Sequence, residues 1–391
     1  MLPLITRRDW LRLSATTAGL ATLSWECAAG AENPPSSKAL IVRSQQPFNA
    51  EPELQRLVAS AVTPVEQFYV RNHGPIPDFE AAEFRVKIEG LVHKPAELSL
   101  AQIQDAFPEQ EAPATLTCAG NRRREMSAIK TVPGVQWDAG AIGHAQWKGA
   151  ALWQLLEKAG LQAGAKHVWF EGLDPIQEKD GSVAPFGGSI PLDRALDKRQ
   201  PALIAHTMNG KPLTLEHGFP LRSLVPGYIG ARSVKWLAKI VVSDRPSPNH
   251  YVAEAYKFVA TDSKVELAKA EPIYEFPINA AICSPGTGAR LRVGEVTVTG
   301  YALPPGNGQT TIAKIELSTD RGRTWKAARL DGEPVANCWQ LWSTTIALPA
   351  GDHELVVRAI DSTGRTQPEQ SDWNLKGYLY NAWHRCRVTV A

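Results

Sequence analysis

The sequence predicts an α+β domain followed by an all-β sandwich, and a change of pattern along the chain carries this prediction. Up to about residue 245, short runs with helical spacing alternate with short runs of strand character. After "SDRPSPNH" (243–250), no convincing helical pattern follows, and alternating strands are separated by Gly, Pro, Asn and Asp turns. Their spacing suits an immunoglobulin-like β-sandwich of roughly 100 residues. We place the two domains at residues 32–265 and 266–391.

The first domain opens with a polar, turn-rich segment, residues 32–50, which we interpret as an extended arm. The run "PELQRLVASAV" from Pro52 has helical spacing, whereas "EFRVKIEGLV" from Glu83 alternates like a strand. Ser99 is a residue type that caps helices, and the helical run "LAQIQDAF" follows it. The run "PATLTC" then predicts a strand that ends at Cys118.

Later in this domain, "ALWQLLEKAG" predicts a helix that stops at Gly160, and "KHVWFEG" predicts the next strand. The strands of the second domain are predicted in three stretches, "RLRVGEVTVTGYA" (290–302), "TIAKIELSTDRGRTWKAARL" (311–330) and "HELVVRAIDSTG" (353–364).

The first 31 residues have the pattern of a targeting segment. The paired Arg7 and Arg8, with Trp10 and a leucine behind them, precede a weakly apolar run and the small-residue stretch "AGA" (29–31). This looks like a twin-arginine signal, although an amphipathic N-terminal helix is the alternative. We therefore expect export to the periplasm, and because this pathway carries folded proteins, we expect a cofactor already inserted.

Composition narrows the class of protein and the kinds of partner that it can bind. The chain of 391 residues is 43% apolar and 21% charged, with a formal net charge of +2, as in ordinary soluble globular proteins. This balance gives no reason to expect nucleic acid or an anionic membrane as a partner. Outside the first thirty residues, no apolar run is long enough to span a bilayer.

The cysteines predict neither a zinc site nor covalently attached haem. Once Cys27 is removed with the signal, Cys118, Cys283, Cys338 and Cys386 remain, without a CxxC or CxxCH motif. A disulfide between Cys338 and Cys386 is possible in an oxidising compartment. We favour buried free thiols.

Cys118 stands out because it precedes three consecutive arginines in "TLTCAGNRRREM" (115–126). It could be a buried structural thiol, a nucleophile, or a thiolate ligand kept ionised by a metal and by nearby cations. The glycine and asparagine after it permit a tight turn that would project the thiol into a pocket. Composition alone leaves these three readings open.

Six motifs resemble the sulfite oxidase family of molybdenum enzymes, in the family's order, from about residue 64 to the C-terminus. They are "YVRNHGPIP" (69–77), "TLTCAGNRRREM", "VPGVQWDAGAIGHAQWKG" (132–149), "FEGLD" (170–174), "MNGKPLTLEHGFPLRSLVPGYIGARSVKWL" (208–237) and "NAWHR" (381–385). The resemblance implies a molybdopterin-binding domain followed by the immunoglobulin-like domain.

The resemblance implies a molybdenum–pterin cofactor (Mo-molybdopterin) in which Cys118 supplies the protein's one bond to the metal. Arg222 and Lys235 would hold the cofactor's phosphate, and Asp174 and His217 would pair with pterin ring nitrogens. The full set of implied cofactor contacts is Tyr69, Val70, Arg71, Asn72, His73, Asp174, His217, Arg222, Ser233, Val234 and Lys235.

The implied substrate pocket comprises Arg71, Arg123, Trp137 and Tyr256, with cations replacing the water around a sulfite dianion. One position departs from the family's pattern: the segment "NLKG" has Lys376 where animal and plant members have arginine. Lysine keeps the charge but loses the two-pronged donor. Arg124 could compensate, or it could form a structural ion pair.

These implications lead us to expect a bacterial periplasmic sulfite dehydrogenase without haem or flavin, which oxidises sulfite to sulfate. Because nothing in the chain resembles a haem or flavin domain, electrons would pass one at a time to an external c-type cytochrome. We also expect a homodimer formed through the second domain. The alternatives are a nitrate or sulfoxide reductase on the same scaffold, and a non-enzymatic periplasmic binding protein.

Overall fold

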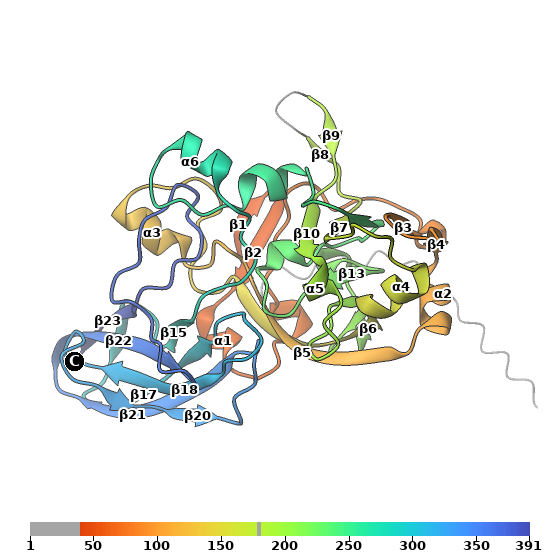
Figure 1. The fold of residues 1–391 in the computed structure, drawn as a ribbon. Helices are drawn as coiled ribbons and strands as arrows, with labels where there is room; N and C mark the ends of the chain where they lie inside the picture. The colour runs from red at the N-terminus through yellow and green to blue at the C-terminus, as the bar shows by residue number, and fades with distance from the viewer. Residues whose placement is uncertain (1–39, 178–180) are drawn as a thin grey trace, which may run out of the picture. The chain divides into compact units, whose positions relative to one another are not determined.

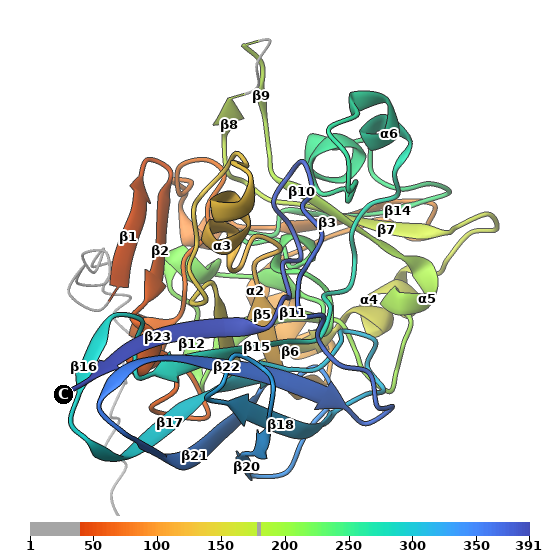
Figure 2. The same cartoon turned by 90° about the vertical axis from the view of Figure 1, so that its left-hand side faces the viewer.

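The computed structural model describes residues 40–177 and 181–391 (Figure 1). The predicted twin-arginine signal lies outside the described residues. Within those residues, the predicted fold class is confirmed: mixed helices and sheets are followed by a β-sandwich (Figure 2). No helix in the described ranges has the length and apolar character needed to cross a membrane.

One mixed sheet of the first domain has the strand order β10-β7-β14-β3-β4. Its only parallel pair joins β14 to β3, and the other neighbours are antiparallel. The central strand β14 is thereby paired on both sides. The bounds are β3 Val86–Gly90, β4 Ala96–Leu98, β7 His167–Glu171, β10 Gly187–Pro191 and β14 Lys239–Ser243.

The second sheet of this domain is antiparallel, with the order β12-β11-β6-β5, and β13 also pairs with β11. The bounds are β5 Glu109–Thr117, β6 Ile142–Ala151, β11 Leu203–Met208, β12 Lys211–Pro212 and β13 Arg222–Leu224. In the β5–β6 register, Thr117 faces Ile142, so the ladder ends where Cys118 begins. The predicted strand ending at Cys118 is therefore confirmed, and it begins earlier than predicted.

Two hairpins lie outside these sheets. The first, β1 (Leu40–Gln45) with β2 (Phe48–Pro52), occupies part of the segment that we expected to be an extended arm. The second joins β8 (Ile176–Gln177) to β9 (Val183–Ala184).

The helices are short, and two of the predicted ones form as expected. They are α1 Leu54–Leu57, α2 Leu100–Ala106, α3 Arg123–Ile129, α4 Leu152–Ala159, α5 Leu192–Ala195 and α6 Lys264–Lys269. The Ser99 hydroxyl accepts from the Gln102 N–H while the Gln102 side chain accepts from the Ser99 N–H, which is a complete capping box on α2. Gly160 ends α4 at a φ of 70°.

Two helix predictions were wrong. The helix expected from Pro52 is a single turn, α1, with no side-chain cap at its start. The region after residue 250 does contain helix: a five-residue π-helical turn, η5 (Tyr251–Ala255), and then α6. Helix α6 has no buried residue, so it lacks the apolar periodicity that a sequence-based prediction needs; its start is defined by Ser263, whose hydroxyl caps the Glu266 N–H.

The second domain packs two sheets face to face. One has the order β15-β17-β21-β20 and the other β16-β23-β22-β18-β19. The bounds are β15 Asn279–Ser284, β16 Ala289–Leu291, β17 Gly294–Leu303, β18 Ile312–Ser318, β19 Lys326–Ala327, β20 Arg329–Asp331, β21 Gln340–Leu348, β22 Gly351–Asp361 and β23 His384–Val390. Their inward side chains form a separate apolar core. Cys283, Cys338 and Cys386 are buried free thiols, as we favoured.

Arg122 is the most heavily bonded link between the two domains. Its side chain is fully buried, and its Nη1 donates to Asn279 Oδ1 and to the Ala382 carbonyl, both at 2.8 Å. Its Nε and Nη2 each donate to the Glu125 carboxylate at 2.7 Å. Its backbone is left-handed, with a φ of 64°, a conformation that needs support from the surroundings.

We expect Arg122→Gln to lower the free energy of unfolding by roughly 3–5 kcal/mol, because it leaves the partners of a buried charge unpaired. Arg124→Gln is the matched control: the Arg124 side chain is 54% exposed and forms one ion pair with Asp138, at 3.2 Å. Exposed pairs contribute about 0–1 kcal/mol. Urea unfolding of both variants measures the difference, and equal losses would contradict the role of Arg122 as the interdomain link.

Candidate cofactor and substrate site

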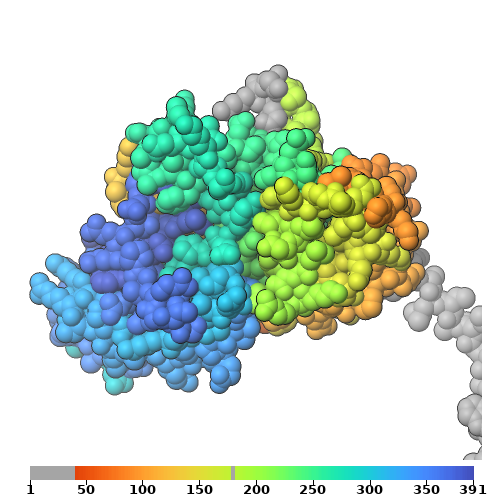
Figure 3. All heavy atoms as spheres, in the orientation of Figure 1, coloured from red at the N-terminus to blue at the C-terminus, as the bar shows by residue number. Residues whose placement is uncertain are grey.

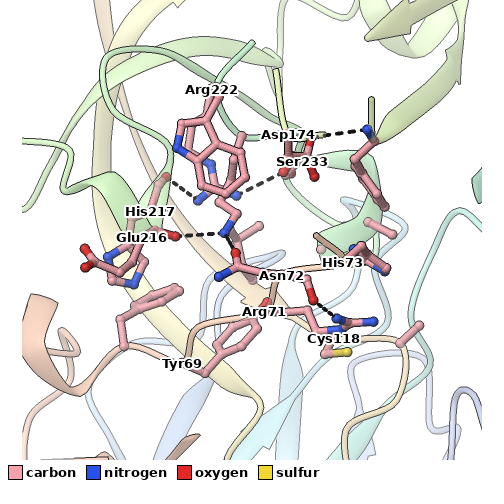
Figure 4. Close-up of a pocket in the computed structure, with 18 of the residues that line it drawn as sticks. Tyr69, Arg71, Asn72, His73, Cys118, Asp174, Glu216, His217, Arg222 and Ser233 are labelled. Atoms are coloured by element: carbon pink, nitrogen blue, oxygen red, sulfur yellow. Dashed lines mark hydrogen bonds between the residues drawn. The ribbon is translucent and has the colours of Figure 1, made fainter. Parts of the chain in front are cut away.

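A cavity in the first domain gathers most of the residues that the resemblance implicated (Figure 4). It encloses about 670 Å³ outside the protein atoms, its mouth included. The predicted residues that line it are Tyr69, Arg71, Asn72, His73, Cys118, Asp174, His217, Arg222, Ser233, Lys235 and Tyr256. They come from six segments spread over almost 190 residues of chain, so only the tertiary fold assembles them.

Some cavity residues were not predicted, and some predicted residues lie elsewhere. The additional lining residues are Phe68, Leu116, Ala119, Phe186, Glu216, Gly230, Ala231 and Trp236. Most of these are apolar and give no chemical signal in a sequence. The predicted residues that do not line the cavity are Val70, Arg123, Trp137, Val234 and Lys376. Val70 instead forms a backbone bridge with Ala50, and Val234 is a buried core residue whose N–H donates to Ser223 Oγ at 2.7 Å.

Cys118 projects into the cavity from a closed turn. Its N–H donates to the Ala141 carbonyl at 2.9 Å, and its own carbonyl accepts from the Asn121 N–H at 2.9 Å. The Gly120 N–H points at Sγ from 3.4 Å. No group of three or more His, Cys, Asp or Glu side chains suited to a metal occurs in the part of the chain that the structure describes. A metal held by Cys118 would therefore need donors from a bound group to complete its coordination.

The cavity carries positive charge without an ionic partner. Arg222 donates only to carbonyls, those of His217 at 2.9 Å, Ser233 at 3.0 Å and Ser223 at 3.4 Å. Lys235 donates to the Glu216 carbonyl at 2.8 Å and to Asn72 Oδ1. Arg71 donates to Asn49 Oδ1 at 3.1 Å and to the Asn72 carbonyl.

No carboxylate among the described residues forms an ion pair with any of these three cations. Burial lowers the pKa of Arg222 to about 10. Burial, with Arg222 beside it, also lowers the pKa of Lys235 well below its ordinary value. A bound anion would relieve both costs.

His217 and Asp174 present polar atoms to the same cavity. Burial lowers the pKa of His217 to about 3, with the cations Lys235 and Arg222 adding to the effect, so its imidazole is neutral. Its Nδ1 lies 2.8 Å from the Thr214 hydroxyl, and its buried Nε2 meets no hydrogen-bond partner of ordinary geometry among the described residues. Asp174 accepts from the Phe186 N–H at 3.2 Å, and burial raises its pKa. Both side chains keep hydrogen-bonding capacity for a polar ring.

A second group of side chains surrounds Tyr256, whose hydroxyl lies 2.7 Å from His73 Nε2. Burial raises the pKa of Tyr256 well above its ordinary value; Arg71 and Arg123 oppose the shift, and the Cys118 thiol adds to it. Arg71, Cys118 and Tyr256 all line the cavity. Tyr256 remains a neutral phenol at neutral pH.

Arg123 reaches this group although it does not line the cavity. It is 4% exposed, and its Nη1 and Nε donate to the carbonyls of Val135 at 2.9 Å and Gly377 at 3.1 Å. No carboxylate of the described residues pairs with it. Arg124 points elsewhere, into its ion pair with Asp138, so the structural role that we considered for it is the one observed.

Trp137 and Lys376, which were also predicted for the substrate pocket, do not line the cavity. Trp137 is fully buried in the same apolar cluster as Cys118, and its indole N–H has no hydrogen-bond partner within the described ranges. Lys376 is half-buried in the turn that supplies the Gly377 carbonyl to Arg123, and it makes interactions of its own.

Family comparisons identify the class of protein. Residues 73–251 match the model of the oxidoreductase molybdopterin binding domain, and residues 270–391 match that of the Mo-co oxidoreductase dimerisation domain. The two domains are thus those of a molybdopterin oxidoreductase.

Individual relatives narrow the class to a family. Sulfite oxidase of Gallus gallus is 43% identical over 369 residues, which cover 91% of this chain and 79% of the relative. Sulfite oxidase of Arabidopsis thaliana is 38% identical, over 90% of this chain and 95% of the relative. The sulfane dehydrogenase SoxCD of Paracoccus pantotrophus shares the fold, with a TM-score of 0.77 at 24% identity, over 92% of this chain and 91% of the other. The chain belongs to the sulfite oxidase family.

The residues present fit the cofactor of that family. The cations without carboxylate partners in one part of the cavity suit the phosphate of the cofactor. The unpartnered Nε2 of His217 suits a pterin nitrogen. The single thiol of Cys118 suits a metal whose other donors come with the cofactor. In Figure 4, Arg222 and Cys118 lie at opposite ends of the labelled set, which places the expected phosphate site away from the expected metal site.

We expect inorganic phosphate to raise the melting temperature of the cofactor-free protein, because an anion binds the folded cation cluster and not the unfolded chain. Sodium chloride at equal ionic strength is the solvent control, and Lys235→Met is the control variant, in which the shift should shrink. An equal response to phosphate and chloride in the unsubstituted protein would contradict an anion site.

Proposed function

We propose that this protein is a sulfite dehydrogenase, which oxidises sulfite to sulfate at a molybdenum–pterin centre. The observation that carries the proposal is the pair of guanidinium groups of Arg71 and Arg123, which have no carboxylate partner among the described residues. Arg71 lines the cavity beside Cys118 and Tyr256, and Arg123 lies over the Tyr378 ring on which Tyr256 stacks. A small dianion needs paired cations to replace its water. Both of the most similar relatives described above are sulfite oxidases, which supports the same substrate.

The bound cofactor would supply the two-electron redox chemistry and the oxygen that is transferred. This chain's residues would do the rest: Cys118 holds the metal, while Arg71 and Arg123 bind and orient the anion. The protonated Tyr256 offers a hydrogen bond at the same place, with its phenol held by His73. The family resemblance assigns two further donors to this pocket, the buried indole N–H of Trp137 and the ammonium group of Lys376.

The test is sulfite-dependent reduction of cytochrome c by the purified holoenzyme, with the variant Arg123→Gln. Loss of one charged partner of a desolvated anion should cost roughly 2–5 kcal/mol, seen as a higher KM for sulfite. Arg124→Gln is the matched control, since the neighbouring guanidinium is half-exposed and paired with Asp138. Absence of sulfite turnover in molybdenum-loaded protein refutes the function, and an unchanged KM in Arg123→Gln refutes the pocket assignment.

We further propose that the enzyme works in the periplasm, is exported by the twin-arginine pathway, and passes single electrons to a soluble c-type cytochrome. The arginine pair Arg7–Arg8 supports export, and the match to a dimerisation domain model supports a homodimer built on the second domain. A two-fold, self-complementary contact is the commonest way for soluble chains to pair.

Light scattering at micromolar concentration tests the dimer. We expect twice the mass of one chain, which is 42.6 kDa before any processing. A particle with the mass of a single chain would contradict the dimer and leave the second domain as a docking surface.

A further inference from the structure

The connection between β22 and β23 carries a turn, residues 374–379, out of the sandwich and into the catalytic site. Figures 1 and 2 both show this connection rising away from the sandwich sheets beside α3. Its Leu379 N–H donates to the carbonyl of Ala119, next to Cys118, at 2.7 Å. Its Gly377 carbonyl accepts from Arg123 Nε at 3.1 Å. The second domain therefore contacts both the turn of the thiol and the expected anion-binding cation.

The turn is rigid. The fully buried Asn374 accepts from the Tyr378 N–H at 2.9 Å and donates to the Tyr378 carbonyl at 2.7 Å. Leu379 is left-handed, with a φ of 59°, a conformation that an ordinary side chain adopts only when its surroundings impose it. At Gly377 (φ 66°), a Cβ would lie 2.6 Å from Val132 Cγ2 and 2.9 Å from Arg123 Nε, so only glycine fits.

This geometry places the ring of Tyr378 against two site residues at once. The Arg123 guanidinium carbon lies 5.1 Å from its centroid, in cation–π contact. The Tyr256 ring stacks on it at 5.0 Å between centroids and 19° between planes. Gly120 and Gly134 crowd Arg123 from other directions, because a Cβ on either would come within 3 Å of its guanidinium group.

We propose that Tyr378, supplied by the second domain, is a positioning residue for sulfite binding: its ring holds the Arg123 guanidinium and the Tyr256 phenol in their relative places. This inference rests on the proposed function. It assigns the role to the face of the ring, because both contacts are made through the face and neither needs the hydroxyl.

The competing explanation is a stacking contact that only stabilises the fold. Tyr380, two residues along the same connection, is the matched control for it. The ring centroid of Tyr380 also lies 5.1 Å from a buried guanidinium carbon, that of Arg122, which binds Glu125 and the sandwich instead of the pocket. A purely structural ring should have the same effect at either position.

The experiment compares Tyr378→Leu, Tyr378→Met, Tyr378→Phe and Tyr380→Leu in the molybdenum-loaded protein. It measures the melting temperature, kcat and KM for sulfite, and the Kd of sulfate by calorimetry. We expect both ringless Tyr378 variants to raise KM and the sulfate Kd about tenfold, because the cation loses its aromatic support. Tyr378→Phe should restore both, and Tyr380→Leu should lower the melting temperature without moving either.

Three outcomes would overturn the proposal. One is an unchanged sulfate Kd in the ringless Tyr378 variants, and another is an equal rise of the Kd in Tyr380→Leu. The third is failure of both ringless variants to fold while Tyr378→Phe folds, which would assign the ring to the fold. Sulfate binding needs no turnover, so this readout tests the role of Tyr378 independently of the proposed function. If the unsubstituted protein does not oxidise sulfite but the ringless Tyr378 variants raise the sulfate Kd tenfold, the function is refuted and the positioning role stands.

Discussion

Buried positive charge without a carboxylate partner is the constraint on which the rest of the site depends. Among the described residues, Arg222 and Lys235, with Arg71 further along the cavity, donate hydrogen bonds to carbonyl and amide oxygens and to no carboxylate. Backbone dipoles position these groups but do not neutralise them, and the lowered pKa values of Arg222 and Lys235 express the remaining cost. A protein keeps such an arrangement where an anionic group completes it, and the phosphate of a pterin cofactor is an anion of this kind.

The same principle links the cofactor to the substrate and the first domain to the second. Arg123 is a further buried cation without an ionic partner, and its three supports come from the Val135 carbonyl, the Gly377 carbonyl and the Tyr378 ring. Two of these three belong to the second domain. Arg122, one residue earlier, is bonded into the sandwich directly. The second domain is thus part of the site's architecture, because it fixes the two arginines that follow the Cys118 turn.

Much of the site could be predicted from the sequence because its chemistry lies in short motifs. The motifs that resemble the family implicated Cys118, Arg222 and Lys235, which residue type alone did not single out, and their segments converge as the resemblance implied. Phe186 and Tyr378 could not be predicted in this way, since an aromatic residue in a loop signals nothing until the fold shows which cation or ring it contacts. Local periodicity failed at α6 for a different reason, because this exposed helix buries no residue. The boundary at residue 265 and the roles assigned to single residues stay predictions.

We infer that the cavity binds a molybdenum–pterin cofactor through its unpaired cations. The molybdenum and pterin content of the purified protein tests this binding. Molybdenum and pterin are measured per chain in the unsubstituted protein and in the double variant Arg222→Met/Lys235→Met, both produced in cells that make the cofactor. We expect molybdenum and pterin equimolar with the chain in the unsubstituted protein, and a large loss of both in the double variant. A chain that binds no pterin, or a double variant that retains it in full, would contradict the account.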